Sequence, residues 1–301
     1  MYSIMQSLDK LRNHLGSFGV VCNDAGGTGQ VVAMLADWNL DPSWVRAEGP
    51  ALNIWREELP CSRFASNLNW LGSISTLLTT TGWSSNVEHE ARALAKNKGI
   101  YSISVLDHWV NYESRFTRNG VTILPDEIWV VDEYAEARAK IAFPDVIVIR
   151  FQDHYARRLL RKVSPVSASA PDAILYLLEP IRSDWGGFEP GEFQALKYFF
   201  EVLPLLGLPS AIKIWLKLHP SEEPRKYADV LSSGQRFETQ IFCGDLASAI
   251  SGVQWVAGVQ TYAMTIALAA GRRVFSSLPP WAPPPVLPHR GIEYLRDRIV
   301  T

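Results

Sequence analysis

The sequence predicts an α/β protein made of two parallel-sheet domains, and three observations support this. Short apolar strands alternate with helix-like stretches along most of the chain. The segment 164–173, SPVSASAPDA, interrupts this pattern with small and polar residues that are typical of an exposed linker. The alternation then restarts. We therefore expect a first domain over 1–163 and a second over 174–288.

In the first domain, apolar and β-branched runs predict strands, and stretches with helical periodicity predict helices. Gly99 follows the second helix in the position of a C-terminal cap. The expected strands are 18–22, 43–53, 75–80, 101–106, 127–131 and 146–149, and the expected helices are 31–38, 86–98 and 133–142.

The same signals continue in the second domain, where the prolines of 278–288 exclude regular structure. A last helix is expected over 291–299. The other expected strands are 174–178, 212–218, 254–259 and 274–277, and the other expected helices are 192–206, 223–232 and 262–270.

Composition excludes several classes of protein. The chain has 301 residues, of which 47% are hydrophobic and 20% charged, so global disorder is excluded. A net charge of −2 favours neither a nucleic acid nor more than peripheral contact with a membrane. The 3 cysteines are far apart and the first 17 residues lack a signal-peptide core, so we expect a cytoplasmic protein. The sequence indicates no oligomeric state.

A glycine-rich stretch follows the first strand. Gly26, Gly27, Thr28 and Gly29 are expected to form a loop in which glycines allow positive φ and close backbone approach, so that amides can bind a phosphate. The stretch is neither a dinucleotide fingerprint nor a Walker A loop. A plain tight turn is the alternative. Asp24, just before it, is either a general base or a helix cap.

Two other strands of the first domain end near acidic residues. Glu88 lies three residues after Ser85, which is capping-box spacing, but it could instead be a catalytic carboxylate. Asp107 and His108 follow the strand 101–106, where they suit sugar binding or base catalysis, although Asp107 could cap the next segment. The nearby Arg115 is expected at the surface, or paired with a phosphate.

In the second domain, the strand 212–218 alternates cleanly and presents Lys217 and His219 on one face. Pro220 ends it. His219 therefore lies at a carboxyl strand end, where an imidazole can donate to a phosphate or polarise a leaving group. The alternative is that His219 caps a helix or bonds a loop carbonyl.

Two further segments of this domain follow strands. Gln260, Thr261 and Tyr262 open a helix whose first amides can bind a diphosphate, although simple capping by Thr261 is an alternative. Glu179 and Arg182 follow the strand 174–178. Glu179 either binds ribose hydroxyls or is structural.

The glycine-rich stretch Gly26–Gly29 resembles the GGTG-type turn of the MurG and PseG group, which use UDP-sugars. Gln30 stands where those proteins carry a histidine. His219-Pro220 resembles the His-Pro motif of bacterial sialyltransferases, polysialyltransferases and Kdo-transferases. In those families the histidine contacts the CMP phosphate, and a serine or threonine further on, matched here by Thr261, completes the pocket. The layout resembles the GT-B glycosyltransferase superfamily.

This resemblance implies two Rossmann-like domains facing across a cleft: an acceptor domain over 1–163 and a donor domain over 174–288. The segment 289–301 would be a helix that returns to the first domain. The implied activity is transfer of a sugar from a CMP- or UDP-linked donor to a glycan or other hydroxyl acceptor in bacterial surface polysaccharide or glycoconjugate synthesis. No cofactor is implied. No metal is required, because helix amides and His219 can neutralise the leaving group, and the sequence also lacks an evident DxD motif.

The resemblance also implies site residues. The acceptor base would be one of three carboxylates, which the sequence does not rank: Asp24, Glu88 and Asp107. His219 would stabilise the departing nucleotide. The donor would be bound by Gly26, Gly27, Thr28, Gly29, His108, Glu179, Arg182, Lys217, His219, Pro220, Gln260, Thr261 and Tyr262. A nucleotide-sugar hydrolase or 2-epimerase on the same fold is an alternative, and so is a non-catalytic sugar-nucleotide-binding subunit.

Overall fold

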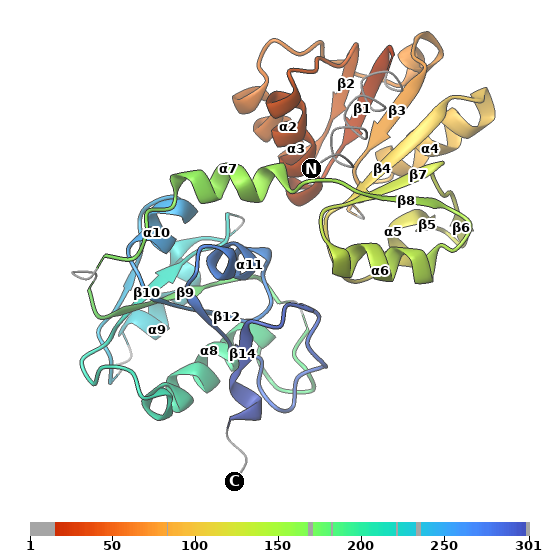
Figure 1. Cartoon of the computed structure of the whole chain (residues 1–301). Coiled ribbons are helices and arrows are strands. Elements are labelled where there is room, and N and C mark those ends of the chain that lie inside the picture. The colour runs from red at the N-terminus through yellow and green to blue at the C-terminus, as the bar shows by residue number, and fades with distance from the viewer. Residues whose placement is uncertain are drawn as a thin grey trace. The chain divides into compact units, whose positions relative to one another are not determined.

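The computed structural model describes residues 16–82, 84–167, 171–181, 183–220, 222–232 and 236–298. The chain divides into two compact units, Met1–Tyr155 and Ala156–Thr301 (Figure 1). The division falls within helix α7 (His154–Lys162), ahead of the linker that the sequence predicts.

In the described part of the first unit, six strands form one parallel sheet in the order β2-β1-β3-β4-β7-β8. The strand order reverses between β1 and β3, which makes their carboxyl ends the switch point of this sheet. The strands are β1 (Phe18–Cys22), β2 (Trp44–Ala47), β3 (Thr76–Thr79), β4 (Tyr101–Leu106), β7 (Glu127–Val130) and β8 (Ile147–Arg150).

Helices cover both faces of this sheet because successive residues of a strand point to opposite sides. Val20 belongs to a core cluster with α2 and α3, whereas its neighbour Val21 packs with α4 and the 3-10 helix η1. The elements are α2 (Ala25–Trp38), α3 (Gly49–Glu58), η1 (Asn69–Ser73), α4 (Val87–Lys98), α5 (Tyr112–Phe116), α6 (Glu133–Ala142) and a two-stranded sheet of β5 (Thr117–Arg118) and β6 (Val121–Thr122).

The described strands of the second unit form a six-stranded parallel sheet in the order β11-β10-β9-β12-β13-β14. Counted from the first strand of this unit, the order is 3-2-1-4-5-6, that of the Rossmann fold, with its switch point between β9 and β12. The strands are β9 (Ala173–Leu177), β10 (Lys213–Lys217), β11 (Thr239–Ile241), β12 (Trp255–Gly258), β13 (Arg273–Ser276) and β14 (Ile292–Tyr294).

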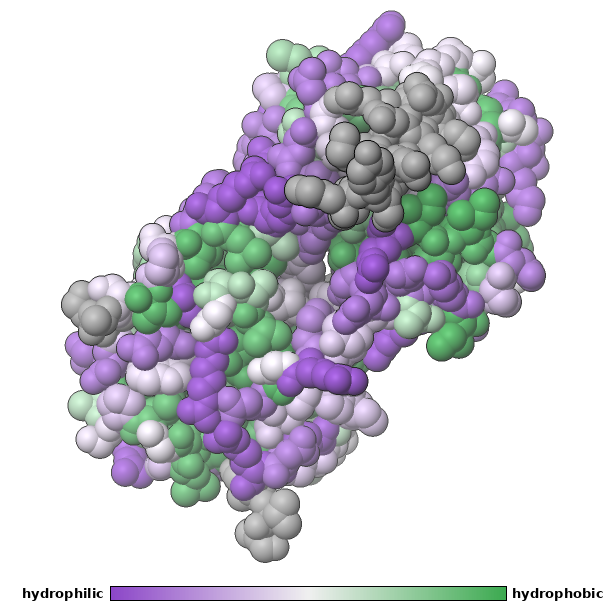
Figure 2. Space-filling model, viewed as in Figure 1, coloured by the Kyte–Doolittle hydropathy of each residue, from purple (hydrophilic) through white to green (hydrophobic). Residues whose placement is uncertain are grey.

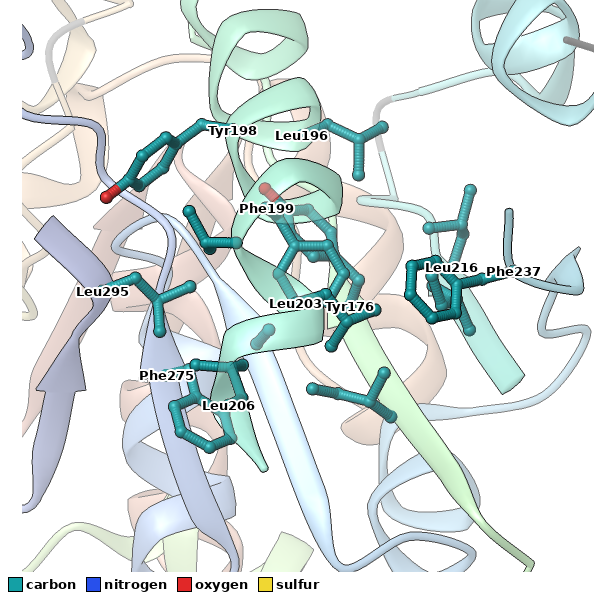
Figure 3. Close-up of a cluster of buried hydrophobic side chains, with 14 of the residues drawn as sticks. Tyr176, Leu196, Tyr198, Phe199, Leu203, Leu206, Leu216, Phe237, Phe275 and Leu295 are labelled. Atoms are coloured by element: carbon teal, nitrogen blue, oxygen red, sulfur yellow. The ribbon is translucent and has the colours of Figure 1, made fainter. Parts of the chain in front are cut away.

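The core of the second unit lies between its sheet and α8. Figure 3 shows Phe199 and Leu203, from α8 and the turn after it, among Tyr176 and Phe275 of the sheet. The helices of this unit are α8 (Gly191–Val202), η2 (Leu203–Leu206), η3 (Pro224–Tyr227), α9 (Ala228–Ser232), α10 (Leu246–Ser251), α11 (Tyr262–Ala269) and η4 (Leu295–Asp297).

One strand and one helix expected from the sequence are wrong. The strand expected over 43–53 ends at Ala47, because α3 begins at Gly49, which has a positive φ of 52°, and Pro50 lies in its first turn. The helix expected over 291–299 is instead the strand β14 followed by η4, in the part of this segment that is described. β14 lies beside β13 and buries Ile292, so ladder hydrogen bonds replace helical ones.

The surface is mixed in character. On the face shown in Figure 2, hydrophilic and hydrophobic residues are interspersed over each unit. Among the helices that are described, none is long and apolar enough to cross a membrane.

Candidate active site

Ligands of open parallel sheets bind outside the carboxyl ends of the strands, where the strand order reverses. In the first unit this point lies between β1 and β3. Asp24 follows β1, Gly82 follows β3, and Glu88 stands in the first turn of α4. The switch point therefore brings together residues that are far apart in the sequence.

The glycine-rich stretch is the first part of helix α2, so the expected loop is wrong. Asp24 caps this helix: its Oδ2 accepts a hydrogen bond from Gly27 N at 2.8 Å. None of the glycines in the stretch has a positive φ. They are needed for close packing, since a Cβ at Gly26 would lie 2.2 Å from Asp107 Oδ2 and one at Gly27 2.8 Å from Thr80 Cβ.

Glu88 is buried and turned toward β1. Its Oε1 accepts hydrogen bonds from Asn23 N at 3.1 Å and from the Thr80 hydroxyl. The capping box is wrong, because Ser85 Oγ accepts from Val87 N at 3.2 Å while the Glu88 carboxylate bonds elsewhere. The position of the Glu88 side chain is therefore set by its hydrogen bonds with Asn23 and Thr80.

Two carboxylate oxygens flank Gly82. A Cβ at this position would lie 3.1 Å from both Asp24 Oδ1 and Glu88 Oε2. Both oxygens are buried and have no hydrogen-bond partner within the described residues. The absence of a side chain at Gly82 thus leaves two acceptor atoms close together, each able to receive or hold a proton.

Burial changes the protonation of this pair. Burial, and next the charge of Asp107, raises the pKa of Asp24 to about 6. Burial, and next the charge of Asp24, raises the pKa of Glu88 to about 8. At neutral pH Glu88 therefore keeps its proton while Asp24 is ionised, so one carboxyl can donate and the other can accept.

An ion pair holds the third carboxylate. Arg115 Nη1 lies 3.1 Å from Asp107 Oδ1 and also donates to Thr81 O. Arg115 is only 8% exposed, so the expectation of a surface charge is wrong. Burial, and next the charge of Arg115, lowers the pKa of His108 to about 4, and its Nδ1 accepts from Trp109 N. His108 is neutral at this edge.

We expect Glu88→Gln to stabilise the protein at high pH only. The raised pKa means that folded Glu88 holds a proton which the unfolded chain has released, so stability falls as the pH rises from about 4.5 to about 8. Glutamine keeps the Oε1 acceptor and does not titrate. The Tm at pH 9 should rise by a few degrees, since about 1 kcal/mol corresponds to roughly 2–4 °C.

Thermal unfolding at pH 5 and pH 9 measures this effect. Glu90→Gln, an exposed carboxylate on the same helix, is the matched control and should give no such gain. An equal change in Tm at both pH values for Glu88→Gln would contradict the raised pKa.

In the second unit, three strands end at the sheet edge that contains the switch point. Glu179 follows β9, Gln260 follows β12 on one side, and His219 follows β10 on the other. Gln260 N donates to Glu179 Oε1 at 2.8 Å. Lys217 is the last residue of β10 and pairs in register with Leu177 of β9. These expected residues therefore share one sheet edge.

Helix α11 begins at this edge with Tyr262. Thr261 is its N-cap residue, but its side chain makes no capping hydrogen bond, so simple capping by Thr261 is wrong. Gln260 Oε1 is buried without a hydrogen-bond partner among the residues described. Pro220 is exposed after His219, and Arg182 lies outside the described residues.

A charged network that sequence reasoning missed supports this edge. Lys226 Nζ bridges the carboxylates of Glu192 and Glu222, both of which are largely buried. Glu222 N donates to His219 O at 2.9 Å, which ties the network to the histidine. The only signal in the sequence was the four-residue spacing of Glu222 and Lys226, which suits an ion pair.

This network affects two expected site residues. Burial raises the pKa of Glu179 to about 7, although the hydrogen bond from the Gln260 amide lowers it. The charges of Glu222 and Glu192 add to the rise. Burial lowers the pKa of His219, which favours the neutral imidazole. A neutral imidazole keeps one N–H donor. Across the described residues, no group of three or more His, Cys, Asp or Glu side chains is placed to hold a metal ion.

Neither a protein-family model nor a curated protein matches this chain in sequence. Many solved structures are similar in fold, and two of them are MnaA and MurG. S. aureus MnaA, solved with UDP, matches with a TM-score of 0.56 and 12% identity over 86% of this chain and 78% of its own. Acinetobacter baumannii MurG matches with a TM-score of 0.50 and 12% identity over 94% of this chain and 89% of its own. The predicted fold class, two Rossmann-like units of the GT-B type, is confirmed.

Proposed function

We propose that this GT-B chain is a glycosyltransferase that moves a sugar from a nucleotide-sugar donor to a hydroxyl group of an acceptor. One observation carries the proposal: the unpartnered oxygens of Asp24 and Glu88 flank Gly82 at the switch point of the first unit. The pKa values of the two carboxyl groups differ, so at neutral pH Asp24 is ionised and can accept a proton from a hydroxyl while Glu88 stays protonated.

Asp24 is the base in this proposal. Its Oδ1 has no hydrogen-bond partner among the described residues, while Oδ2 is held by the helix cap, so the position of the accepting atom is fixed. Glu88 stays protonated at neutral pH and its Oε2 can donate to the acceptor oxygen. Asp107 forms an ion pair with Arg115, and the charge of Asp107 raises the pKa of Asp24.

The second unit binds the donor in this proposal. The start of α11 at Thr261 and the neutral His219 hold the phosphates, and His219 donates to the departing nucleotide. Glu179 binds ribose hydroxyls. MnaA was solved with UDP, so UDP-sugars are the first donors to test, and the His-Pro motif makes CMP-sugars the second. We propose a metal-independent reaction in the cytoplasm, within bacterial surface-glycan synthesis.

Transfer should decline in acid. The base must be ionised to act, and the pKa of Asp24 is raised to about 6, so activity is present above this pH and is lost as the pH falls through it. At pH 5 about a tenth of Asp24 is ionised, so kcat/KM should be roughly tenfold lower than at pH 7.5. Initial rates across this range measure the effect, and a flat profile would argue against Asp24 as the base.

The decisive experiment uses the full chain and UDP-, CMP-, GDP- and CDP-sugars. Binding is measured as a rise in Tm with each nucleotide, and products are analysed with and without a panel of glycan acceptors. A glycosylated acceptor supports the proposal. Sugar released to water alone indicates a hydrolase, an altered donor sugar an epimerase, and binding without turnover a sugar-nucleotide-binding subunit. No binding of any nucleotide overturns it.

A further inference from the structure

The first unit contains a pocket of about 440 Å³ beside the start of α4. It lies between the end of β2, the loop before η1 and the first turn of α4. Its walls are formed by Arg46, Glu48, Asn67, Leu68, Ser85, Asn86, Val87 and Glu90. None of these residues belongs to the carboxylate site around Gly82, so the pocket is a separate feature.

One wall of the pocket is held in place by its own contacts. The Arg46 guanidinium pairs with Glu48, and Arg46 Nη1 also donates to Ala65 O at 3.4 Å. The second oxygen of Glu48 accepts from Ser85 Oγ at 3.2 Å. The charges of Arg46 and Glu48 therefore offset each other, and neither side chain has to reorganise before a ligand binds.

Other groups of the pocket are available to a ligand. Asn67 Oδ1 accepts from Asn69 N at 3.0 Å, and its amide NH₂ has no partner within the described residues. Asn86 is the N-cap residue of α4 but its side chain makes no capping hydrogen bond. Glu90 presents an exposed carboxylate. The pocket thus offers amide donors and a charged acceptor at its walls.

This set of groups fits a sugar ring. Hydroxyls both donate and accept, so they can pair with an amide and a carboxylate at once. Leu68 and Val87 add short apolar surface for the C–H face of the ring. Because Arg46 is offset by Glu48, the charge of Glu90 leaves the pocket net negative, which favours an uncharged ring over an anionic one.

We propose that this pocket binds an uncharged sugar ring of the acceptor. The inference rests on the proposed function, since it names the acceptor that Asp24 would deprotonate. The first turn of α4 connects the two sites: Val87 lines the pocket, and the next residue, Glu88, bonds to Asn23 and Thr80 in the carboxylate site. An acceptor ring held here would lie beside Val87, one residue from Glu88, which donates to the acceptor oxygen in the proposed reaction.

The test measures binding of methyl β-glucoside, methyl β-N-acetylglucosaminide and methyl β-glucuronide to the full chain by saturation-transfer NMR. The two neutral glycosides should bind wild type more tightly than the glucuronide. Asn67→Ala should lower the affinity for the neutral glycosides roughly fivefold, as expected for one lost hydrogen bond. Asn97→Ala, an exposed asparagine at the other end of α4, is the matched control and should change nothing.

Glu90→Gln tests the charge argument. This variant should bind the neutral glycosides more weakly than wild type does. Its affinity for the glucuronide should come closer to its affinity for the neutral glycosides, so the ratio of the two affinities falls. A merely structural role of Glu90 would weaken both classes equally and overturn the inference. Equal glycoside binding by wild type and Asn67→Ala would also overturn it.

A nucleotide control separates this inference from the proposed function. If UDP or CMP raises the Tm but no glycoside binds, the pocket inference is overturned and the proposed function stands. If neither a nucleotide nor a glycoside binds, both are overturned. Glycoside binding that is lost in Asn67→Ala while the nucleotide effect on Tm is kept supports the inference.

Discussion

Asp24→Asn should lower the rate of sugar transfer by about 10²–10⁴-fold, the contribution of a positioned general base. The amide has almost the shape of the carboxylate but cannot take up the acceptor proton. Its oxygen can still accept from Gly27 N, and asparagine is as good a helix cap as aspartate, so α2 should be unaffected. The loss should therefore appear in kcat while the Tm stays within a few degrees of wild type.

The matched control for this variant is Asp245→Asn. Asp245 caps α10 in the same way, with its Oδ1 accepting from Ser248 N at 2.7 Å, but it is not one of the proposed catalytic or binding residues. Transfer rates with the best donor and acceptor pair are measured for wild type and both variants. Equal rates for the two variants would show that Asp24 only caps its helix.

His219→Ala should lower kcat by about 10²–10³-fold, the usual loss when one donor to a developing negative charge is removed. The backbone contact of His219 does not depend on its side chain, because the His219 carbonyl accepts from Glu222 N. We therefore expect the turn after β10 to persist. The change in KM for the donor should be smaller than the change in kcat, because the charge on the leaving phosphate grows in the transition state.

His289→Ala is the matched control for His219. Both histidines are half-buried in the second unit, and the carbonyl of each accepts an amide three residues further on. Steady-state kinetics of the two variants should therefore differ if the imidazole of His219 acts on the donor. A loss confined to KM would leave His219 as a binding residue without a role in nucleotide departure.

The strand-end rule explains how much of the site could be predicted. Asp107 follows an apolar strand directly, and Asp24 and His219 lie two residues beyond theirs, so a parallel sheet places all three at a carboxyl edge. Their partners carry no such signal. Gly82 matters because its missing Cβ leaves room between two carboxylates, and Arg115 matters because of one ion pair. Both are three-dimensional contacts that spacing does not reveal.

The fold was predictable for a similar reason, with exceptions at short elements. Long apolar strands such as Tyr101–Leu106 are recognisable from composition, because their residues are buried on both faces. The three-residue strand β14 is not, since Ile292–Tyr294 pairs only through tertiary contact with β13. Glycines allow positive φ and close backbone approach, which predicts a loop at Gly26–Gly29, whereas the stretch is helical and close packing against Asp107 and Thr80 requires glycine here.

The two oxygens beside Gly82 also have a consequence for inhibitor design. At neutral pH one of them, on Asp24, is an acceptor, and the other, on Glu88, carries a proton. A compound that presents a donor and an acceptor side by side, such as a primary amide, matches both. A carboxylate fragment would be repelled by Asp24, so screening collections rich in acids are poorly suited to this pair.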